Sequence, residues 1–447
     1  MNFLSKFFNI NEHLDLFYYL PNYSDFIYSF FISIILINYG KIFQKLFETS
    51  FVSSGISIFF ICFYIYDFYF LFLTQNFSFR VNFLIFNLII LLISYLKKKK
   101  NLRYFAYIGI IYLFLKYMLV KILAIQRLDI NQLLPDEIYF WFPSQQNILN
   151  NNLAFAISNN TFKNEAGKTL LIPHIKSTIQ TFTSNHFDNV FLISISLCFF
   201  YLIIYLISEL RIDLKIKFLS ISLFLIISFC STWWSHVFFL STYGEGVTGY
   251  LYCTLTLYFV NLLKHSPFSV LVLSTLWFSK YFASIIIFPV AIFIMYKRQN
   301  LTLSKIAILC LPFLINFFNY RIILNSTKLL DGYINTSLTE RVMLFQLNKL
   351  GSIFLILFKD NNLNVLILIF IFLVILGFNH KLVAHEQIFI NITILTMVIS
   401  VFLILILYMY VDPYNPGDSG FRYLHNFIPN LIICNSILLD KLFSYNR

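Results

Sequence analysis

The stretch FRVNFLIFNLIILLISYLKKKKNLR, residues 79–103, decides the fold class of this chain. Its apolar run 79–96 is about as long as a helix needs to be to cross the roughly 30 Å hydrocarbon core of a bilayer. The run ends at four consecutive lysines, Lys97 to Lys100, and Arg103 follows shortly after. Cations gather on the cytoplasmic side of membrane spans. The stretch therefore predicts a transmembrane helix whose C-terminal end faces the cytoplasm.

The composition of the whole chain extends this prediction beyond one helix. Of the 447 residues, 59% are hydrophobic and only 12% are charged, which is more apolar surface than a soluble fold of this size can bury. The formal net charge of +12 would suggest nucleic-acid binding in a soluble protein, but here the cations lie in short loops beside apolar runs. We expect an integral membrane protein surrounded by membrane lipids, with no nucleic-acid partner.

Apolar runs of similar character recur along the chain. They lie near 26–47, 51–73, 79–96, 104–125, 188–209, 218–232, 247–263, 268–296, 306–320, 363–378, 388–410 and 426–441. This pattern predicts an all-α fold, a polytopic transmembrane helical bundle of about 12 spans. We see no linker and no separable soluble region, so we expect a single integral membrane domain over 1–447.

The basic loops give these spans a common orientation. Counting outward from the four lysines, the following loops all reach the cytoplasmic side: those around Lys41 and Lys45, 211–217, 264–265, 297–298 and 380–381. The run 268–296 then needs a break near Lys280, because both of its ends are basic. A lysine inside a span is costly and marks a functional candidate, unless its long side chain simply extends to the membrane surface.

The longest polar loops fall on the opposite, extracytoplasmic side. They cover 126–187, 231–246, 321–362 and 411–425, and we expect them to form a small cap over the bundle. Long ordered loops usually carry function. Three clusters of polar residues in these loops are therefore the candidates for a site.

The first cluster is the pair Asp136 and Glu137 in LPDEIYFWFP, residues 134–143. Two adjacent carboxylates at the end of a span, inside a belt of aromatic residues, place acid/base chemistry at the lipid–water boundary. Either carboxylate is suited to accept a proton from an alcohol. The alternative is an interfacial helix cap or a salt bridge.

The second cluster is Glu245, which lies between two glycines and follows an aromatic-rich loop that includes His236. Such a tight loop suits a close approach to a substrate, so we expect both residues to contribute to substrate binding. Glu245 also opens the predicted span 247–263. An acid at a helix N-terminus is an ordinary capping residue, and both roles stay open.

The third cluster is Arg422, Tyr423 and His425, just before the last predicted span. Arg422 and His425 are three residues apart and share one face of a helix that starts there. Cations at a helix start bind phosphate well, and an arginine grips it with two parallel hydrogen bonds. Alternatively, Arg422 neutralises Asp412 or Asp418.

Other chemistries find little support in the sequence. His174 and His186 lack the spacing to a cysteine or second histidine that a zinc site has, and the six cysteines lie singly in apolar surroundings as small packing residues. There is no Walker loop and no GxGxxG, which argues against direct use of a cytoplasmic nucleotide. We expect no metal site and no bound cofactor, although the sequence leaves a divalent ion open.

As an ordered set, the three clusters resemble the C-type glycosyltransferases, the polytopic membrane enzymes that use polyprenyl-phosphate sugars and include protein O-mannosyltransferases and lipid A aminoarabinose transferases. The resemblance covers roughly 120–440. It implies that Asp136 is the general base, that Glu245 shapes the acceptor or a metal site, and that Arg422 binds the lipid-linked phosphate. Family members place the catalytic loop after the first span, whereas four spans precede it here. The segment 1–103 is then an added module before a catalytic core at 104–447.

The reaction that this resemblance implies needs few groups from the protein. A sugar on a polyprenyl phosphate already carries its leaving group, so catalysis needs a base on the acceptor hydroxyl and cations on the departing phosphate. Asp136 or Glu137 would supply the base, and Arg422 with Lys280 or His425 the cations. In-line attack inverts the anomeric centre. The acceptor is expected to be a glycan, a lipid or a protein on the periplasmic or exterior face of a bacterial inner membrane.

Three other functions fit parts of the pattern. A flippase or exporter of lipid-linked glycans also needs many spans, but it favours charges deep in several spans and internal two-fold similarity. An O-antigen-type polymerase or ligase also handles polyprenyl-linked sugars, typically through Arg-rich outer loops. The third alternative is a membrane scaffold, in which the three clusters are ordinary charged residues of the loops.

Overall fold

The structure of the chain is a computed structural model. It describes residues 23–69, 76–122, 142–158, 170–182, 191–230, 245–262, 351, 361–377, 382–410 and 424–445. Across these ranges the regular secondary structure is helical, without a strand. The helices are α3 (Tyr23–Phe47), α4 (Val52–Tyr69), α6 (Phe79–Leu96), α7 (Leu102–Ile122), α8 (Phe142–Asn150), α9 (Leu153–Ser158), α10 (Leu171–Gln180), α11 (Phe191–Glu209), α12 (Leu214–Cys230), α14 (Glu245–Leu262), α21 (Asn361–Gly377), α22 (Ala384–Tyr410) and α24 (Ile428–Tyr445).

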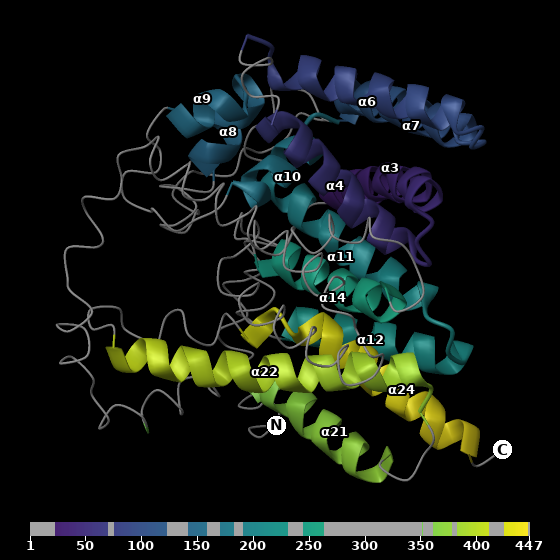
Figure 1. Cartoon of the computed structure of the whole chain (residues 1–447), viewed down its shortest axis with the longest axis vertical. Coiled ribbons are helices and arrows are strands. Elements are labelled where there is room, and N and C mark those ends of the chain that lie inside the picture. Colours follow the sequence, from purple (N-terminus) through teal and green to yellow (C-terminus); the bar gives the residue numbers. More distant parts are fainter. Residues whose placement is uncertain are drawn as a thin grey trace, which may run out of the picture.

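The long helices lie side by side in one bundle (Figure 1). The helices α6 and α7 form one edge, α3, α4, α11 and α14 lie next to them, and α12, α22, α24 and α21 complete the other side. Every predicted apolar run that falls on described residues is a helix. The runs 268–296 and 306–320 lie outside these residues, as do Lys280 and the proposed break beside it.

Within the described ranges, three helical segments are long and apolar enough to cross a membrane, as judged by length and composition. They are Phe26–Phe47, Phe79–Leu96 and Ala384–Phe402. Shorter apolar helices accompany them at Val52–Phe68, Leu197–Glu209 and Leu363–Leu376. The fold is thus a helical bundle suited to membrane association, and the full number of spans stays a prediction.

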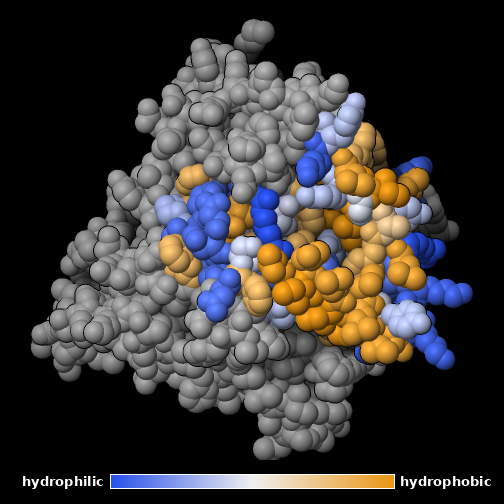
Figure 2. All heavy atoms as spheres, turned by 90° about the horizontal axis from the view of Figure 1, so that it is seen from above, coloured by the Kyte–Doolittle hydropathy of each residue, from blue (hydrophilic) through white to orange (hydrophobic). Residues whose placement is uncertain are grey.

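Helix α6 has the apolar outer surface that is typical of a lipid-facing helix. Its buried residues recur at helical spacing on one face and include two polar ones, Asn82 and Ser94. Its exposed face is apolar and carries Val81, Leu84, Leu88 and Leu92. A helix on the surface of a soluble protein has the reverse pattern, with polar residues outside. Seen from above, the face that α6 and α7 cover shows an apolar band with hydrophilic residues at both of its ends (Figure 2).

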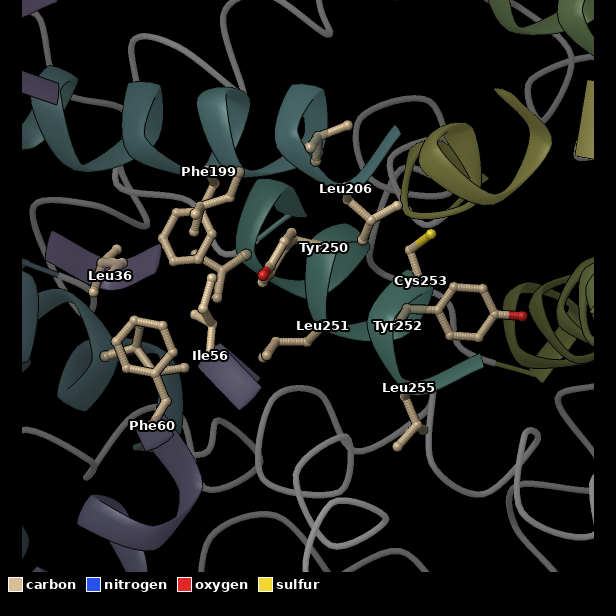
Figure 3. Packing of buried hydrophobic residues seen from close by; sticks show 14 of the residues in the cluster. Leu36, Ile56, Phe60, Phe199, Leu206, Tyr250, Leu251, Tyr252, Cys253 and Leu255 are labelled. Atoms are coloured by element: carbon tan, nitrogen blue, oxygen red, sulfur yellow. The ribbon is translucent and has the colours of Figure 1, made fainter. Parts of the chain in front are cut away.

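Helix α14 is enclosed by the bundle, because every residue from Gly246 to Tyr258 is buried. Tyr250 packs near Ile56 of α4 and beside Phe199 of α11, with the Tyr250 and Phe199 ring centroids 5.8 Å apart (Figure 3). Burial of such large side chains on all sides fixes α14 against its neighbours.

Polar side chains of α14 also bond to three neighbouring helices. The hydroxyls of Thr254 and Ser57, on α4, lie 2.7 Å apart. Tyr252 bonds the Thr396 hydroxyl of α22. The Asn430 amide of α24 donates to Thr256 over 3.3 Å. Hydrogen bonds between helices are a common means of holding membrane bundles together.

Two glycines let α3 and α4 approach backbone to backbone. A Cβ atom added at Gly55 would lie 2.1 Å from the carbonyl oxygen of Gly40, and one added at Gly40 would lie 2.7 Å from the carbonyl oxygen of Val52. Small residues permit this close approach of helices in membranes. Any side chain at Gly55 must push the two helices apart, because the obstacle is backbone.

The described basic loops meet at one end of the bundle. Lys99 Nζ lies 3.2 Å from Glu48 Oε1, which joins the α6–α7 turn to the α3–α4 turn. At the α11–α12 turn, the Asp213 N–H donates to Asp440 of α24 over 2.9 Å. Next to Asp440, Lys441 Nζ lies 3.1 Å from Glu386 Oε1 of α22.

We call this region the basic end; its described cations are Lys41, Lys45, Lys97, Lys98, Lys99, Lys100, Arg103, Arg211, Lys215, Lys217 and Lys441. The prediction that the basic loops share one side is confirmed for these residues. The loops 264–265, 297–298 and 380–381 lie outside the described ranges. That the basic end faces the cytoplasm remains a prediction from the distribution of cations.

The opposite end of the bundle holds α8, α9 and α10 (Figure 1). All three belong to 126–187, which the sequence predicts to be part of an outer cap. All 10 residues of α10 are buried, including Lys176. This helix therefore belongs to the interior of the bundle and does not lie on its surface as a cover.

Candidate functional site

The predicted site residues fall mainly outside the described part of the chain. The side chain of His425 is described, and of Glu245 the backbone is described. The others outside the described residues are Asp136, Glu137, His236, Lys280, Arg422 and Tyr423. The structure therefore bears on the second and third clusters through the helices that begin beside them.

The starts of α14 and α24 lie next to each other. Glu245 is the first residue of α14, and Gly249 follows one turn later. A Cβ atom added at Gly249 would lie 3.3 Å from the backbone oxygen of Asn426, the neighbour of His425. Both helices run from here toward the basic end, where α24 carries Asp440. Two sequence clusters far apart in the chain thus have their helix starts side by side at the opposite end.

His425 lies in a short helical turn just before α24, and its side chain is buried. Its neighbours Leu424 and Phe427 are buried as well. An imidazole in this position is enclosed by protein on all sides. A phosphate that contacts His425 therefore has to sit between helices and not at an open surface.

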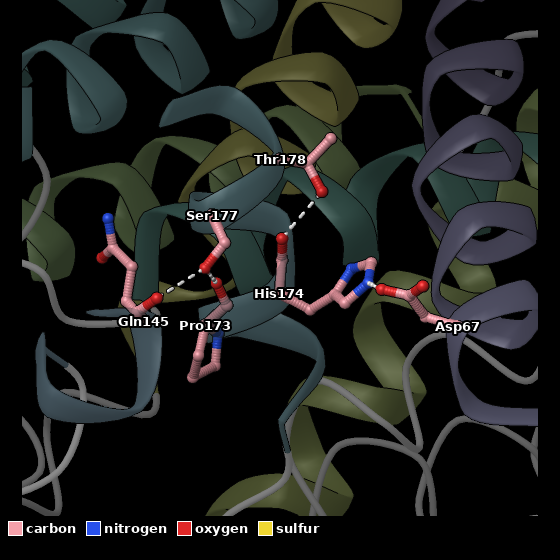
Figure 4. A network of polar contacts seen from close by, with 6 residues as sticks. All are labelled: Asp67, Gln145, Pro173, His174, Ser177 and Thr178. Atoms are coloured by element: carbon pink, nitrogen blue, oxygen red, sulfur yellow. Dashed lines mark hydrogen bonds and ion pairs between the residues drawn. The ribbon is translucent and has the colours of Figure 1, made fainter. Parts of the chain in front are cut away.

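The opposite end also holds a buried ionisable pair that no sequence motif predicts. His174 Nε2 of α10 lies 3.0 Å from Asp67 Oδ2 of α4, and the two side chains are 0% and 1% exposed (Figure 4). The Asn82 side chain of α6 is a further hydrogen-bond partner of the Asp67 carboxylate. One buried carboxylate therefore joins α4, α6 and α10.

Three aromatic rings enclose the imidazole of His174. Those of Phe63, Tyr64 and Phe79 have centroids 4.9, 5.1 and 5.2 Å from the centroid of the His174 ring. They keep water away, which strengthens the attraction between His174 and Asp67. Among the described residues, His174 Nδ1 and Asp67 Oδ1 have no hydrogen-bond partner. Buried polar atoms without hydrogen-bond partners lower the stability of the fold. Other interactions of the helices that the pair joins must offset this cost.

A second set of hydrogen bonds joins α10 to α8. Ser177 Oγ donates to the carbonyl oxygen of Gln145 over 2.9 Å, and the Gln145 side-chain amide donates to Gln180 Oε1 over 2.6 Å. Within α10, Thr178 Oγ1 donates to the carbonyl oxygen of His174 (Figure 4). Proline in the first turn of each helix, Pro143 and Pro173, is compatible with its start, because the first turn has no use for that N–H.

The pair can hold a proton, but it has no route to a substrate in this conformation because both side chains are fully buried. Its direct effect is on position, since it ties the segment that contains α10 to α4. One sequence signal could have identified it. Asp67 lies inside the apolar run 51–73, and an acid within such a run is a functional candidate by default.

No metal centre is found among the residues described here, where no three His, Cys, Asp or Glu side chains come together. Four cysteines with described side chains, Cys62, Cys198, Cys253 and Cys434, are free thiols, and all except the half-buried Cys62 are buried. They are packing residues, as the sequence predicts.

Known proteins offer no direct comparison for this site. No protein-family model, no curated protein and no solved structure matches the chain. The likeness to C-type glycosyltransferases therefore rests on the three ordered clusters of the sequence, and the function is inferred from the residues themselves.

Proposed function

We propose that this protein is a membrane glycosyltransferase of the C type, which transfers a sugar from a polyprenyl-phosphate donor to an extracytoplasmic acceptor. The observation that carries the proposal is the meeting of the starts of α14 and α24 at the end of the bundle opposite the basic end. Two of the three clusters that the reaction needs lie beside these helix starts. Had the starts been at different ends, the two clusters would be unable to act on one substrate.

The proposed roles follow from the chemistry of the transfer. Asp136, or its neighbour Glu137, removes the proton from the acceptor hydroxyl as the hydroxyl attacks the anomeric carbon, and the sugar–phosphate bond breaks. Arg422, with Lys280 or His425, stabilises the negative charge on the departing polyprenyl phosphate. Glu245, His236 and Tyr423 shape the substrate pocket.

The surface of the bundle supports a donor that carries a prenyl tail. The outer faces of α6, α7 and α21 expose large apolar side chains, as lipid-facing helices do. The basic end, by its cations, is assigned to the cytoplasm. The opposite end then faces the periplasm or exterior of a bacterial inner membrane.

Under this proposal the buried pair is a positioning device. Asp136 and Glu137 precede α8, and α10 follows in the same predicted outer loop, 126–187. Asp67 and His174 tie α10, which belongs to that loop, to α4. They act through the loop and do not touch the substrate.

The test measures release of undecaprenyl phosphate from a panel of hexosyl undecaprenyl phosphates by the full-length protein in lipid nanodiscs, with a membrane extract as acceptor. Asp136→Asn combined with Glu137→Gln should lower turnover by about 10²–10⁴-fold. Glu48→Gln removes an exposed acid at the basic end and should leave turnover unchanged. Unchanged release by the double variant, at equal amounts of inserted protein, would rule out the proposed base.

A second candidate function is a flippase for a lipid-linked glycan. The observation that favours it is the buried Asp67 and His174 pair, because ionisable residues inside a membrane bundle are common in transport pathways. The nanodisc assay together with a sealed-vesicle assay distinguishes the two, since a flippase breaks no bond. Breakdown of the donor in nanodiscs that contain the protein, but not in nanodiscs without it, would exclude a pure flippase. Movement of intact donor across the membrane of a sealed vesicle that contains the protein would support one.

A further inference from the structure

At the basic end, three cations from two helices surround one aromatic ring. Lys41 Nζ and Lys45 Nζ of α3 lie 5.7 and 4.7 Å from the centroid of the Tyr104 ring, and Arg103 Cζ of α7 lies 4.8 Å from it. Arg103 also donates to the Tyr104 hydroxyl over 2.9 Å. The ring is buried, while Arg103 is exposed and the two lysines are half-buried. The ring thus gathers the cations at the edge of the bundle.

This arrangement has a cost that an anion would relieve. Lys41 and Lys45 are one helical turn apart, and like charges at that spacing repel each other. The face of the tyrosine ring offsets only part of this repulsion. Among the described residues, no carboxylate lies within ion-pair distance of Lys45 or Arg103.

The carboxylates nearest to the cluster already have partners. Glu209 accepts hydrogen bonds from the backbone N–H groups of Val52 and Ser53, over 2.7 and 3.2 Å, and so caps the start of α4. It attracts Lys41 electrostatically. Glu48 forms its ion pair with Lys99. The two cations that remain, Lys45 and Arg103, are therefore available to an external anion.

An apolar stripe leads from the cluster along α7. Tyr107, Ile110, Phe114 and Tyr117 follow Arg103 at alternating spacings of four and three residues, so all five lie on one face of the helix. The four apolar and aromatic side chains are each at least 40% exposed. A lipid acyl chain that lies on this stripe has its headgroup beside Arg103.

We propose that Lys45 and Arg103, held by the ring of Tyr104 with Lys41 beside them, bind the phosphate of one anionic phospholipid whose acyl chain lies along the α7 stripe. Arginine offers a fork of donors to the phosphate oxygens, and lysine adds a compact charge. The stripe is the reason to choose a lipid over a free phosphate ion, because inorganic phosphate gains nothing from it. The site is independent of sugar transfer at the opposite end.

The experiment measures binding of phosphatidylglycerol to the full-length protein by native mass spectrometry from detergent, with phosphatidylcholine, a zwitterionic lipid without net charge, as the reference. Each cation near an anionic headgroup contributes a factor of about five to binding, so Lys45→Gln with Arg103→Gln should weaken phosphatidylglycerol binding by about twentyfold. Lys97→Gln with Lys98→Gln removes the same charge from two exposed lysines of the same end that make no contact with the Tyr104 ring. This control should lose less than about threefold.

Two further arms complete the test. Lys45→Arg with Arg103→Lys keeps both charges and should retain most of the affinity, and unfolding temperatures measured in phosphatidylcholine alone should agree among all variants. The proposal is overturned by equal losses in the two glutamine variants, by equal affinity for phosphatidylcholine, or by displacement of the lipid with an equimolar amount of inorganic phosphate, which would indicate a free-anion site.

Discussion

The two ends of the bundle use charge in opposite ways. At the basic end the ion pair of Lys99 and Glu48 is 35% and 77% exposed, and the helices beneath it are joined by the backbone contact of Gly40 and Gly55. At the opposite end Asp67 and His174 are fully buried. An exposed pair contributes little to stability, whereas a buried pair is costly to break. The difference teaches that this protein keeps most of its described charge at the exposed basic end, whereas a single buried pair joins α4 to α10 at the opposite end.

The largest expected effect comes from breaking the buried pair. His174→Ala leaves the Asp67 carboxylate buried without its main partner, and should lower the free energy of unfolding by about 3–5 kcal/mol. The measurement is denaturant unfolding of the full chain in mild detergent, followed by tryptophan fluorescence or circular dichroism.

The matched control replaces both partners. Asp67→Leu with His174→Leu removes the stranded charge, and should recover most of the stability lost in the single variant. A loss below about 1 kcal/mol for His174→Ala would contradict the contrast between the two ends, because the pair would then be worth no more than an exposed one.

An intermediate effect is expected where α3 and α4 touch. Gly55→Ala puts a methyl group against the carbonyl oxygen of Gly40, and overpacking of this kind costs about 1–3 kcal/mol. Gly109→Ala on α7 is the control, since a Cβ atom there meets nothing within 4 Å. That change should be neutral or stabilise the helix by about 0.5–1 kcal/mol. Equal losses of stability in the two variants would show that the close contact between Gly55 and Gly40 is not the cause of the loss.

The smallest effect is expected at the exposed pair of the basic end. Lys99→Ala should change the free energy of unfolding by less than about 1 kcal/mol, because solvent and salt screen the attraction to Glu48. The difference should shrink further when unfolding is repeated at high salt. A loss as large as that of His174→Ala would overturn the distinction between exposed and buried charge in this protein.

The helices could be predicted from the sequence where an apolar run meets sharp polar boundaries. The predicted run 79–96 has the bounds of α6, Phe79–Leu96, and four lysines follow its C-terminal end. The helices α8 and α10 were missed inside the predicted loop 126–187. Their composition is mixed, with Gln, Asn and Ser beside the apolar residues, and their burial depends on partners elsewhere in the chain.

The pairing of Asp67 with His174 could not be predicted, because the two residues are 107 positions apart and no local periodicity relates them. The alternation of spans predicts that α14 and α24 start on the same side of the bundle, whereas the contact between Gly249 and Asn426 comes from the structure. The roles of Asp136, Glu137, His236, Lys280, Arg422 and Tyr423 remain predictions, since these residues lie outside the described ranges.

The enclosed position of α14 has a consequence for how the chain is made. On the ribosome, α14 emerges after α4, so its Thr254 can meet Ser57 at once, but the partners of Tyr252 and Thr256 on α22 and α24 are 144 and 174 residues further on. At about 5–20 residues per second, the newly inserted helix waits roughly ten to thirty seconds for them. During that interval the Tyr252 hydroxyl lacks its partner on α22, whereas the Thr256 hydroxyl already donates to the carbonyl oxygen of Tyr252 within α14. A chaperone that shields this flank of α14 would act in that interval.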